Sequence, residues 1–316
     1  MQTIAPSLII LLFGGLFLCQ TQALDKVSFQ PDWFPNGQFA GFFTAQEKAL
    51  YAEHGLEVQL NTFSFGTEFL DHVANNEAQF GTAEAYILVN AIAEGQPLVA
   101  LGAVLKKSPA GYLYLKKSGI QSARDFSNKR VGFHAYAEEL LPYFLSKAEI
   151  DPQSVTPVKV QNDIQMLIRG EIDLLQGYAI DEFLELQRLT TEPAGFITFE
   201  ALGLPMYSMV IYTSRTFAEE NPETIANFMT ATGQGWQHAL NHPEASAKIL
   251  SKQAHNTATP LDDLEEQINA LRPFILQPDQ EILKTDRTFW ESMLQSFLES
   301  KLIRQPIDLD TLLWGG

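Results

Sequence analysis

The amino-acid sequence predicts an α/β protein built as two lobes. Segments with the alternating pattern of strands are followed by segments with the spacing of helices, and this order occurs in two successive series. The chain has 316 residues, and single domains commonly have roughly 100–200, so the length suits two domains. No internal repeat or low-complexity linker separates the series, which favours lobes joined by extended segments.

Residues 1–23 have the outline of a secretory signal peptide. No charged side chain precedes Asp25, and the apolar run from Leu8 to Leu18 has about half of the roughly 20 residues that a membrane-spanning helix needs. The small residue Ala23 suits cleavage directly after it. We therefore expect export by a cleaved signal. The alternative is a buried amino-terminal strand.

The composition narrows the possible functions. Cys19 is the only cysteine, so cleavage after Ala23 would leave a mature chain without disulfides, cysteine nucleophiles or thiolate metal sites. A lipoprotein modified at Cys19 is the less favoured alternative, because Leu16-Phe17-Leu18 lacks the small residues that lipoprotein processing normally needs there. The net charge of −17 is spread along the chain, which disfavours nucleic acid or an anionic membrane as partner.

The first series runs from Lys26 to Val104 and predicts a β-loop-α-β opening unit. Gly55 ends the first helix, and the strict alternation in residues 56–60 indicates a half-buried strand paired in parallel. We expect strands at 27–30, 56–60, 79–81 and 98–104, and helices at 41–54, 68–75 and 83–94.

The second series follows an extended stretch at 111–115. It comprises segments at 130–133, 138–148, 155–160, 164–169 and 174–178. Beyond 209–212 the pattern becomes mostly helical. Pro222 and Pro243 open helices, residues 261–271 and 289–298 are amphipathic, and these helices are expected to pack on the first lobe.

These patterns divide the mature chain into a discontinuous first lobe and a continuous second lobe. The first lobe is assigned residues 24–111 and 211–316, and the second residues 112–210. The chain would cross between them near Tyr112 and Val210, and two crossings make a hinge.

An aromatic segment from Asp32 to Phe39 is the first candidate for binding a ligand. It follows a strand, and open α/β sheets place ligands in such loops. The indole of Trp33 and a phenyl ring can stack on a heteroaromatic ring, and Asn36 offers both a donor and an acceptor. The alternative is that these aromatic side chains fill the core.

Two further groups stand at predicted strand ends. Tyr178, Asp181 and Glu182 follow the last strand of the second series, where a glutamate can accept hydrogen bonds from an exocyclic amine. The alternative is that the acidic pair only favours the dipole of the following helix. His134 and Tyr136 lie at a strand-to-helix junction that suits a polar ligand.

Metal and catalytic motifs are missing from the sequence. The six histidines have no metal-ligand spacing, and a helix surface explains the pair His238 and His242. The sequence has no G-x-S-x-G, H-E-x-x-H, P-loop or dinucleotide motif. We therefore expect no metal, no cofactor and no enzymatic activity.

Several motifs occur together in a fixed order. They are Asp32-Trp33-Phe34-Pro35-Asn36, Ala45-Gln46-Glu47-Lys48, Tyr51 to Val58, Gly95-Gln96-Pro97, Tyr178 to Glu182, and Asn221-Pro222-Glu223. In this order the chain resembles the periplasmic substrate-binding proteins for thiamine-pyrimidine precursors over its whole mature length. Related proteins bind sulfonates, nitrate or riboflavin. The resemblance implies a type II periplasmic-binding-protein fold, with two α/β lobes joined by a two-strand hinge.

The resemblance also implies a set of ligand residues. Trp33 and Asn36 match the family's loop, and Glu182 matches the glutamate that binds the pyrimidine amine. Asp181 replaces the usual Asn of the family's Tyr-x-x-Asn-Glu motif. Phe39 stands where transport-type members often have His, and in having Phe there the chain resembles the signalling-linked branch instead. The expected ligand-binding residues are Trp33, Asn36, Phe39, Glu84, Tyr136, Tyr178, Asp181 and Glu182.

The leading hypothesis is a monomeric binding protein of an ABC importer that captures a hydroxymethyl- or formylamino-pyrimidine by hinge closure. The alternatives are a sensory module for a membrane receptor, a binding protein for another heteroaromatic or sulfonate-like ligand, and an enzyme with Glu182 or His134 as base. The eukaryotic branch resembles the same fold but makes the pyrimidine with a cysteine cluster, which a mature chain without cysteine cannot supply.

Overall fold

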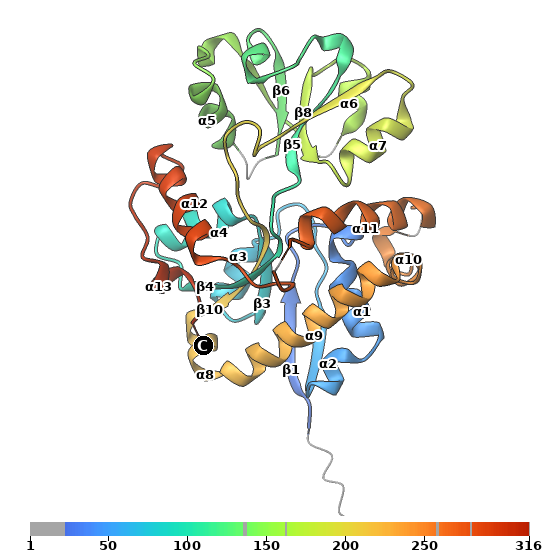
Figure 1. Ribbon diagram of the computed structural model, residues 1–316, viewed down its shortest axis with the longest axis vertical. Coiled ribbons are helices and arrows are strands. Elements are labelled where there is room, and N and C mark those ends of the chain that lie inside the picture. The colour runs from blue at the N-terminus through green and yellow to red at the C-terminus, as the bar shows by residue number, and fades with distance from the viewer. Residues whose placement is uncertain (1–22, 135–137, 162, 257–258, 279, 316) are drawn as a thin grey trace, which may run out of the picture.

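The computed structural model describes residues 23–134, 138–161, 163–256, 259–278 and 280–315. Within these ranges the chain forms two five-stranded sheets, each flanked by helices, in two lobes (Figure 1). This arrangement confirms the predicted two-lobed α/β class. Of the predicted signal peptide only Ala23 is described. None of the helices in the described part of the chain is both long and apolar enough to span a membrane.

The sheet of the first lobe has the strand order β2-β1-β3-β10-β4. The strands are β1 (Asp25–Gln30), β2 (Leu56–Leu60), β3 (Phe80–Ala83), β4 (Leu98–Leu105) and β10 (Ser208–Ser214). β1 pairs in parallel with β2, as the alternation in 56–60 predicts, and also with β3. β10 pairs antiparallel with β3 and β4 after the chain has returned from the second lobe.

Ten α-helices of the described chain belong to the first lobe. They are α1 (Ala40–Glu47), α2 (Leu50–Glu53), α3 (Phe69–Ala74), α4 (Ala85–Ala93), α8 (Arg215–Glu220), α9 (Pro222–Asn241), α10 (Pro243–Leu250), α11 (Leu261–Ile275), α12 (Arg287–Glu299) and α13 (Leu309–Leu312). The prediction of one helix at 41–54 is wrong. Ala49 has φ 58°, a left-handed conformation that interrupts the helix between α1 and α2.

The sheet of the second lobe has the strand order β7-β6-β8-β5-β9. Its elements are β5 (Ala110–Leu115), β6 (Arg130–Phe133), α5 (Leu140–Lys147), β7 (Thr156–Lys159), α6 (Ile164–Ile168), β8 (Leu174–Tyr178), α7 (Glu182–Leu189) and β9 (Ala194–Thr198). β6 is parallel to β7 and β8, and β5 is antiparallel to β8 and β9. The sequence analysis missed β9, which forms the edge beside β5.

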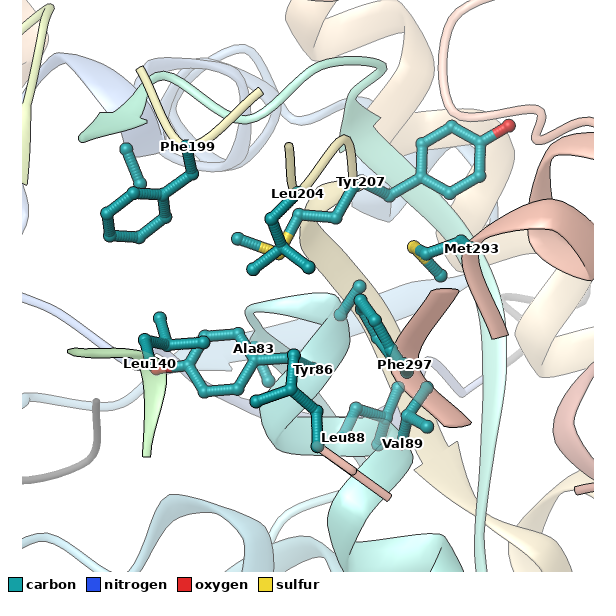
Figure 2. Close-up of a cluster of buried hydrophobic side chains, with 14 of the residues drawn as sticks. Ala83, Tyr86, Leu88, Val89, Leu140, Phe199, Leu204, Tyr207, Met293 and Phe297 are labelled. Atoms are coloured by element: carbon teal, nitrogen blue, oxygen red, sulfur yellow. The ribbon is translucent and has the colours of Figure 1, made fainter. Parts of the chain in front are cut away.

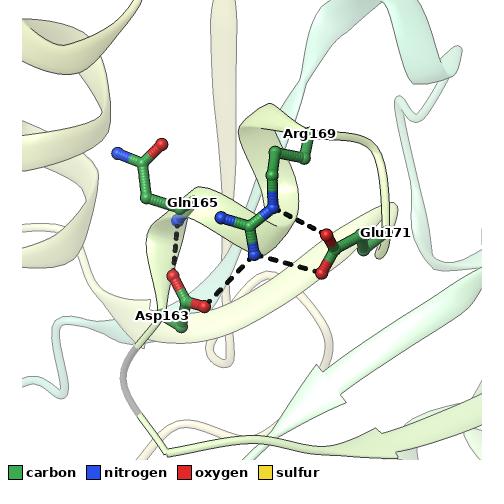
Figure 3. A network of polar contacts seen from close by, with 4 residues as sticks. All are labelled: Asp163, Gln165, Arg169 and Glu171. Carbon is green, nitrogen blue, oxygen red and sulfur yellow. Dashed lines mark hydrogen bonds and ion pairs between the residues drawn. The ribbon is translucent and has the colours of Figure 1, made fainter.

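Short 3-10 helices complete the described elements: η1 (Gly37–Phe39), η2 (Lys116–Ser118), η3 (Ala123–Phe126), η5 (Pro152–Ser154) and η6 (Ala254–Asn256). Local side-chain bonds fix the ends of several helices. At α6, the Asp163 carboxylate accepts a 3.0 Å bond from the backbone N–H of Gln165, and Arg169 pairs with Glu171 at 2.6 Å (Figure 3). Asp163 thereby satisfies a backbone donor that the first helical turn leaves unpaired.

The chain crosses twice between the sheets, at residues 106–109 and 199–207. Tyr112 lies within β5 of the second sheet and Val210 within β10 of the first, so each crossing lies a few residues outside the position named from the sequence. Because β5 belongs to the second sheet and β10 to the first, we propose that residues 110–111 belong to the second lobe and residues 208–210 to the first.

A buried apolar cluster packs around the second crossing. Its labelled side chains come from β3, α4, α5, α12 and the segment 199–207, and all of them are buried (Figure 2). The labelled members are Ala83, Tyr86, Leu88, Val89, Leu140, Phe199, Leu204, Tyr207, Met293 and Phe297. The cluster therefore holds the crossing segment against the first lobe.

Helices α1 and α9 approach closely through two glycines. A Cβ atom on Gly41 would lie 2.3 Å from the ring of Trp236, and one on Gly235 would lie 2.2 Å from the carbonyl oxygen of Gly41. Trp236 is fully buried. Only glycine at both positions permits this contact, which fixes α1 and the loop before it against α9.

Replacing Gly235 should therefore destabilise the protein, whereas replacing Gly233 in the same helix should not. The Cβ of Gly235→Ala would overlap the backbone of α1, and such overpacking costs about 1–3 kcal/mol. In Gly233→Ala the nearest atom lies at 3.9 Å, so its higher helix propensity should leave stability unchanged or raised. Urea unfolding measures both; equal midpoints would contradict the packing account.

Candidate functional site

A cavity of about 80 Å³ lies between the two lobes. The first lobe lines it with Asp32, Trp33, Gln38, Phe69, Glu84, Tyr86 and Ile87, and the second lobe and the crossings contribute Ala110, His134, Gln176, Gly177, Tyr178, Asp181, Glu182 and Phe199. Several of these residues follow the carboxyl ends of β1, β3, β6 and β8. The cavity therefore lies where open α/β sheets place their ligands.

Asp32 and Trp33 follow β1 and form one wall of the cavity. The Thr82 hydroxyl donates a 2.8 Å bond to Asp32 Oδ1. Burial raises the pKa of Asp32 to about 6, although this hydrogen bond lowers it. The indole of Trp33 contacts the rings of Phe34 and Phe63, with centroid distances of 5.7 and 5.6 Å, so neighbouring rings hold it in place.

Glu84 follows β3 and meets Tyr178 from the opposite lobe. Its Oε1 accepts hydrogen bonds from the hydroxyls of Tyr178 and Ser208, which lie 2.9 Å from each other. Its Oε2 is buried and makes no hydrogen bond within the described part of the chain. Burial raises the pKa of Glu84 to about 8, and the negative charge of Asp32 also raises it. The hydroxyls of Ser208 and Ser108 act in the opposite direction. Glu84 is therefore largely protonated at neutral pH.

Asp181 joins the lobes through two amide groups. Asn36 Nδ2 donates to Asp181 Oδ2 at 2.6 Å, and Gln267 Nε2 donates to Asp181 Oδ1 at 2.7 Å. Gln267 is oriented by its own Oε1, which accepts a 2.9 Å bond from the backbone N–H of Gly37. Burial raises the pKa of Asp181 to about 6, against the opposing effect of the Asn36 hydrogen bond.

Glu182 is buried at the first turn of α7 and lines the cavity. Its Oε2 accepts a 2.7 Å bond from the backbone N–H of Tyr178. A Cβ atom on Gly177 would lie 2.9 Å from the Cβ of Glu182, so the glycine permits this close turn. One carboxylate oxygen of Glu182 therefore shapes the turn between β8 and α7.

His134 follows β6 and contacts the opposite lobe. Its backbone N–H donates a 3.0 Å bond to Gln176 Oε1, and its ring meets the Trp33 indole edge to face at a centroid distance of 5.5 Å. Burial lowers the pKa of His134 to about 4. The imidazole is therefore neutral at physiological pH.

The structure brings together most of the residues that the sequence analysis names. Trp33, Glu84, Tyr178, Asp181 and Glu182 all line the cavity. Tyr136 lies outside the described residues.

Asn36 and Phe39 have other positions than expected. Asn36 does not line the cavity but binds Asp181, and its Oδ1 caps η1 by accepting from the backbone N–H of Gln38. Phe39 is 1% exposed, with its ring 6.2 Å from that of Phe42 in the core of the first lobe. Its expected contact with the ligand is not supported by this geometry.

Several residues that line the cavity or bind its lining residues are not predicted from the sequence. Asp32 stands inside the aromatic segment but was not assigned to the ligand. Gln267 lies in α11, and Ser208 begins β10, far along the chain from their partners. No motif marks these two positions; only the three-dimensional fold brings them to the site.

The charge of the cavity limits what it can bind. Four carboxyl groups line it, from Asp32, Glu84, Asp181 and Glu182, and its described lining has no Lys or Arg. Such a wall suits a ligand with N–H donors or positive charge and disfavours an anion. Among the described residues, no group of three His, Cys, Asp or Glu side chains is arranged to hold a metal ion.

The cavity is small for an aromatic ring. Its volume of about 80 Å³ is below the roughly 150 Å³ of an engineered cavity that holds benzene. A heteroaromatic ligand therefore requires the lobes, or the rings that line the cavity, to move apart from the arrangement seen here.

The sequence is similar to that of several known proteins. The model of the family described as "NMT1/THI5 like" matches residues 36–246. A Legionella pneumophila protein named 4-amino-5-hydroxymethyl-2-methylpyrimidine phosphate synthase is 24% identical over 290 residues, 90% of each chain. The formylaminopyrimidine-binding protein of Halalkalibacterium halodurans is 22% identical over 314 residues, 95% of each chain.

Comparison of structures gives a similar protein of known fold. The periplasmic aliphatic sulphonate binding protein SsuA from Escherichia coli superposes with a TM-score of 0.73 at 15% identity, covering 92% of this chain and 98% of that one. At this identity the likeness shows the fold alone. It confirms the predicted periplasmic-binding-protein fold.

The raised pKa of Glu84 predicts a pH-dependent contribution to stability. A carboxyl whose pKa rises on folding from 4.5 to about 8 stabilises the fold below the lower value, and this contribution is lost as pH rises through the upper one. Glu84→Gln cannot ionise. Its free energy of unfolding, relative to wild type, should therefore increase between about pH 5 and pH 8, as measured by urea unfolding.

The control is Glu94→Gln at the exposed carboxyl end of the same helix. This variant removes an exposed carboxyl that does not line the cavity, and so reports the effect of the substitution itself. A Glu84→Gln difference that stays constant across this range would show that Glu84 ionises as readily in the fold as in the unfolded chain.

Proposed function

The chain belongs to the NMT1/THI5-like family, and we propose that it is an extracytoplasmic binding protein that captures a thiamine-precursor pyrimidine between its lobes. The ligand is of the hydroxymethyl- or formylamino-pyrimidine type. The protein delivers it to the permease of an ABC importer. The formylaminopyrimidine-binding relative and the periplasmic-binding-protein fold support this role.

The observation that carries the proposal is the cavity whose described walls combine an indole with four carboxyl groups and no cation. An aminopyrimidine offers a flat ring, exocyclic N–H donors and ring nitrogen acceptors. Trp33 supplies a surface for stacking, and ionised carboxylates accept from the amine. Glu84, largely protonated, supplies the complementary donor to a ring nitrogen.

Ligand capture would proceed by hinge closure around the crossings. The contacts between lobes hold the closed arrangement: Asp181 binds Asn36 and Gln267, and Arg188 of α7 bridges to Asp263 and Glu266 of α11 at 3.2 and 2.8 Å. The ion pairs are accessible to solvent and therefore add little to the stability of the closed arrangement. The partly buried carboxylate of Asp181 contributes more, because its amide donors would otherwise be buried without an acceptor. A ligand that contacts both lobes shifts the equilibrium toward a closed form in which the rings lining the cavity have moved to admit it.

A sulfonate ligand fits the cavity less well. SsuA is described as a sulphonate-binding protein, and a sulfonate anion would require hydrogen-bond donors or positive charge around it. Four carboxyl groups here have the opposite character.

We also propose that the protein is not an enzyme, although one relative is named a synthase. Neutral His134, whose pKa is about 4, is a weak base, and Glu182 already accepts a backbone hydrogen bond with one oxygen. Cys19 is the only cysteine of the sequence, so the chain cannot supply the cysteine cluster described for the eukaryotic branch.

Isothermal titration with 4-amino-5-hydroxymethyl-2-methylpyrimidine tests the proposal. Wild type should bind it and release it unchanged, as checked by mass spectrometry, whereas an alkanesulfonate should give no heat. Trp33→Ala should lose about 1–3 kcal/mol of binding free energy through lost stacking. Trp314→Ala, far from the cavity, is the control. No binding of either this pyrimidine or its formylamino analogue would refute the ligand.

The role of Asp181 predicts a change in the ligand-free shape. Asp181→Ala leaves the amides of Asn36 and Gln267 buried without their acceptor, at a cost of about 1–3 kcal/mol that opening to water relieves. We expect a larger radius of gyration in small-angle scattering, which the pyrimidine reduces. Asp163→Ala, an exposed capping residue of the same lobe, should scatter like wild type. Identical curves for both variants would exclude a closing role for Asp181.

A further inference from the structure

We propose that the natural ligand has two rings: an aminopyrimidine in the inner cavity, and a second flat ring, cationic rather than anionic, in an adjoining outer groove. The outer groove is the space lined by Phe63, Phe65, Phe69, Ile87, His134 and Val160, among others. This inference rests on the proposed function, because it extends the same site beyond the pyrimidine.

The inner cavity and the outer groove adjoin each other. Phe69, Ile87 and His134 line both spaces. Trp33, in the inner wall, contacts Phe63 and Phe65 of the groove at centroid distances of 5.6 and 5.8 Å. A ligand seated against Trp33 therefore lies next to the groove, with the shared side chains Phe69, Ile87 and His134 between the two spaces.

The outer groove is much larger than the inner cavity, as a ligand larger than a pyrimidine requires. The inner cavity has about 80 Å³ and the outer groove about 780 Å³. Ligand pockets commonly have about 300–1,000 Å³. The groove therefore supplies the volume that the inner cavity lacks, and both lobes border it, with Phe63 from the first and Val160 from the second.

Aromatic side chains make the groove suitable for a flat ring. Phe65 is 41% exposed, one of the few large apolar side chains so exposed in the described chain. It is not isolated, because its ring meets those of Trp33, Phe34 and Phe63 within 6.1 Å. A second ring would cover the exposed side of this cluster and bury apolar surface on both partners.

The charges around the groove favour a cation over a phosphate. Glu68 and Asp71 line it, with Lys159 as its cation among the described lining residues. The neighbouring cavity adds Asp32, Glu84, Asp181 and Glu182 without Lys or Arg in its described lining. A positively charged heteroaromatic ring would also be attracted to the faces of the phenyl rings. A phosphoryl group would meet mostly carboxylates.

Thiamine, an aminopyrimidine joined to a thiazolium ring, is the probe with this chemistry. In isothermal titration, wild type should bind thiamine at least tenfold more tightly than 4-amino-5-hydroxymethyl-2-methylpyrimidine. Thiamine pyrophosphate should bind more weakly than thiamine. Phe65→Ala should weaken the binding of thiamine more than that of the hydroxymethylpyrimidine, while Leu189→Ala, an exposed apolar residue outside the groove, should change neither.

The outcomes separate this inference from the proposed function. If the hydroxymethylpyrimidine binds and thiamine binds no more tightly, the second ring is refuted and the pyrimidine site stands. Equal weakening of both ligands by Phe65→Ala also refutes a separate groove, and tighter binding of the pyrophosphate refutes its charge preference. If no pyrimidine compound binds, the proposed function fails together with the inference.

Discussion

The arrangement of the site depends on one partly buried carboxylate, that of Asp181, which accepts a hydrogen bond from the side-chain amide of each of two segments of the opposite lobe. Asn36 belongs to the loop after β1, and Gln267 to α11, which also holds the backbone of Gly37. The pair of bonds therefore fixes the aromatic loop and the start of α7 relative to each other. Because α7 begins at Glu182, shortly after Tyr178, the same contact also positions the cavity wall that the second lobe supplies.

The cavity gathers four carboxyl groups, and burial decides which of them are charged. In a medium of low dielectric constant, neighbouring negative charges repel strongly. Protonation of Glu84, whose pKa is about 8, relieves this repulsion from Asp32. The Glu84 carboxyl can then donate a hydrogen bond while its neighbours accept. Such a combination of donor and acceptor carboxyls suits the proposed aminopyrimidine ligand, which presents both acceptors and donors along one edge.

The sequence predicts the strands well because alternation of apolar residues and burial on a sheet face have the same cause. The ligand loop at Trp33 and the strand end at Tyr178 follow from the rule that ligands bind at carboxyl ends of parallel strands. Phe39 shows the limit. Trp33 lies in the loop before η1, whereas Phe39 is the last residue of η1, and its ring lies in the core beside Phe42. Gln267 has no local signal at all, since its role arises from a tertiary contact with Gly37 and Asp181.

The contacts that close the lobes also limit the ligand's affinity. A pyrimidine entering a space of about 80 Å³ must displace rings or separate the lobes, and the free energy for this comes from the ligand's own contacts. Stacking on Trp33 and hydrogen bonds to the carboxyls would offset part of it. A second ring over Phe65 would add apolar contact where no closing bond has to be broken, because Asp181 and its amide donors do not line the outer groove. In the two-ring proposal, the narrow polar part of the site therefore recognises the pyrimidine, and the wide aromatic part supplies the main gain in affinity.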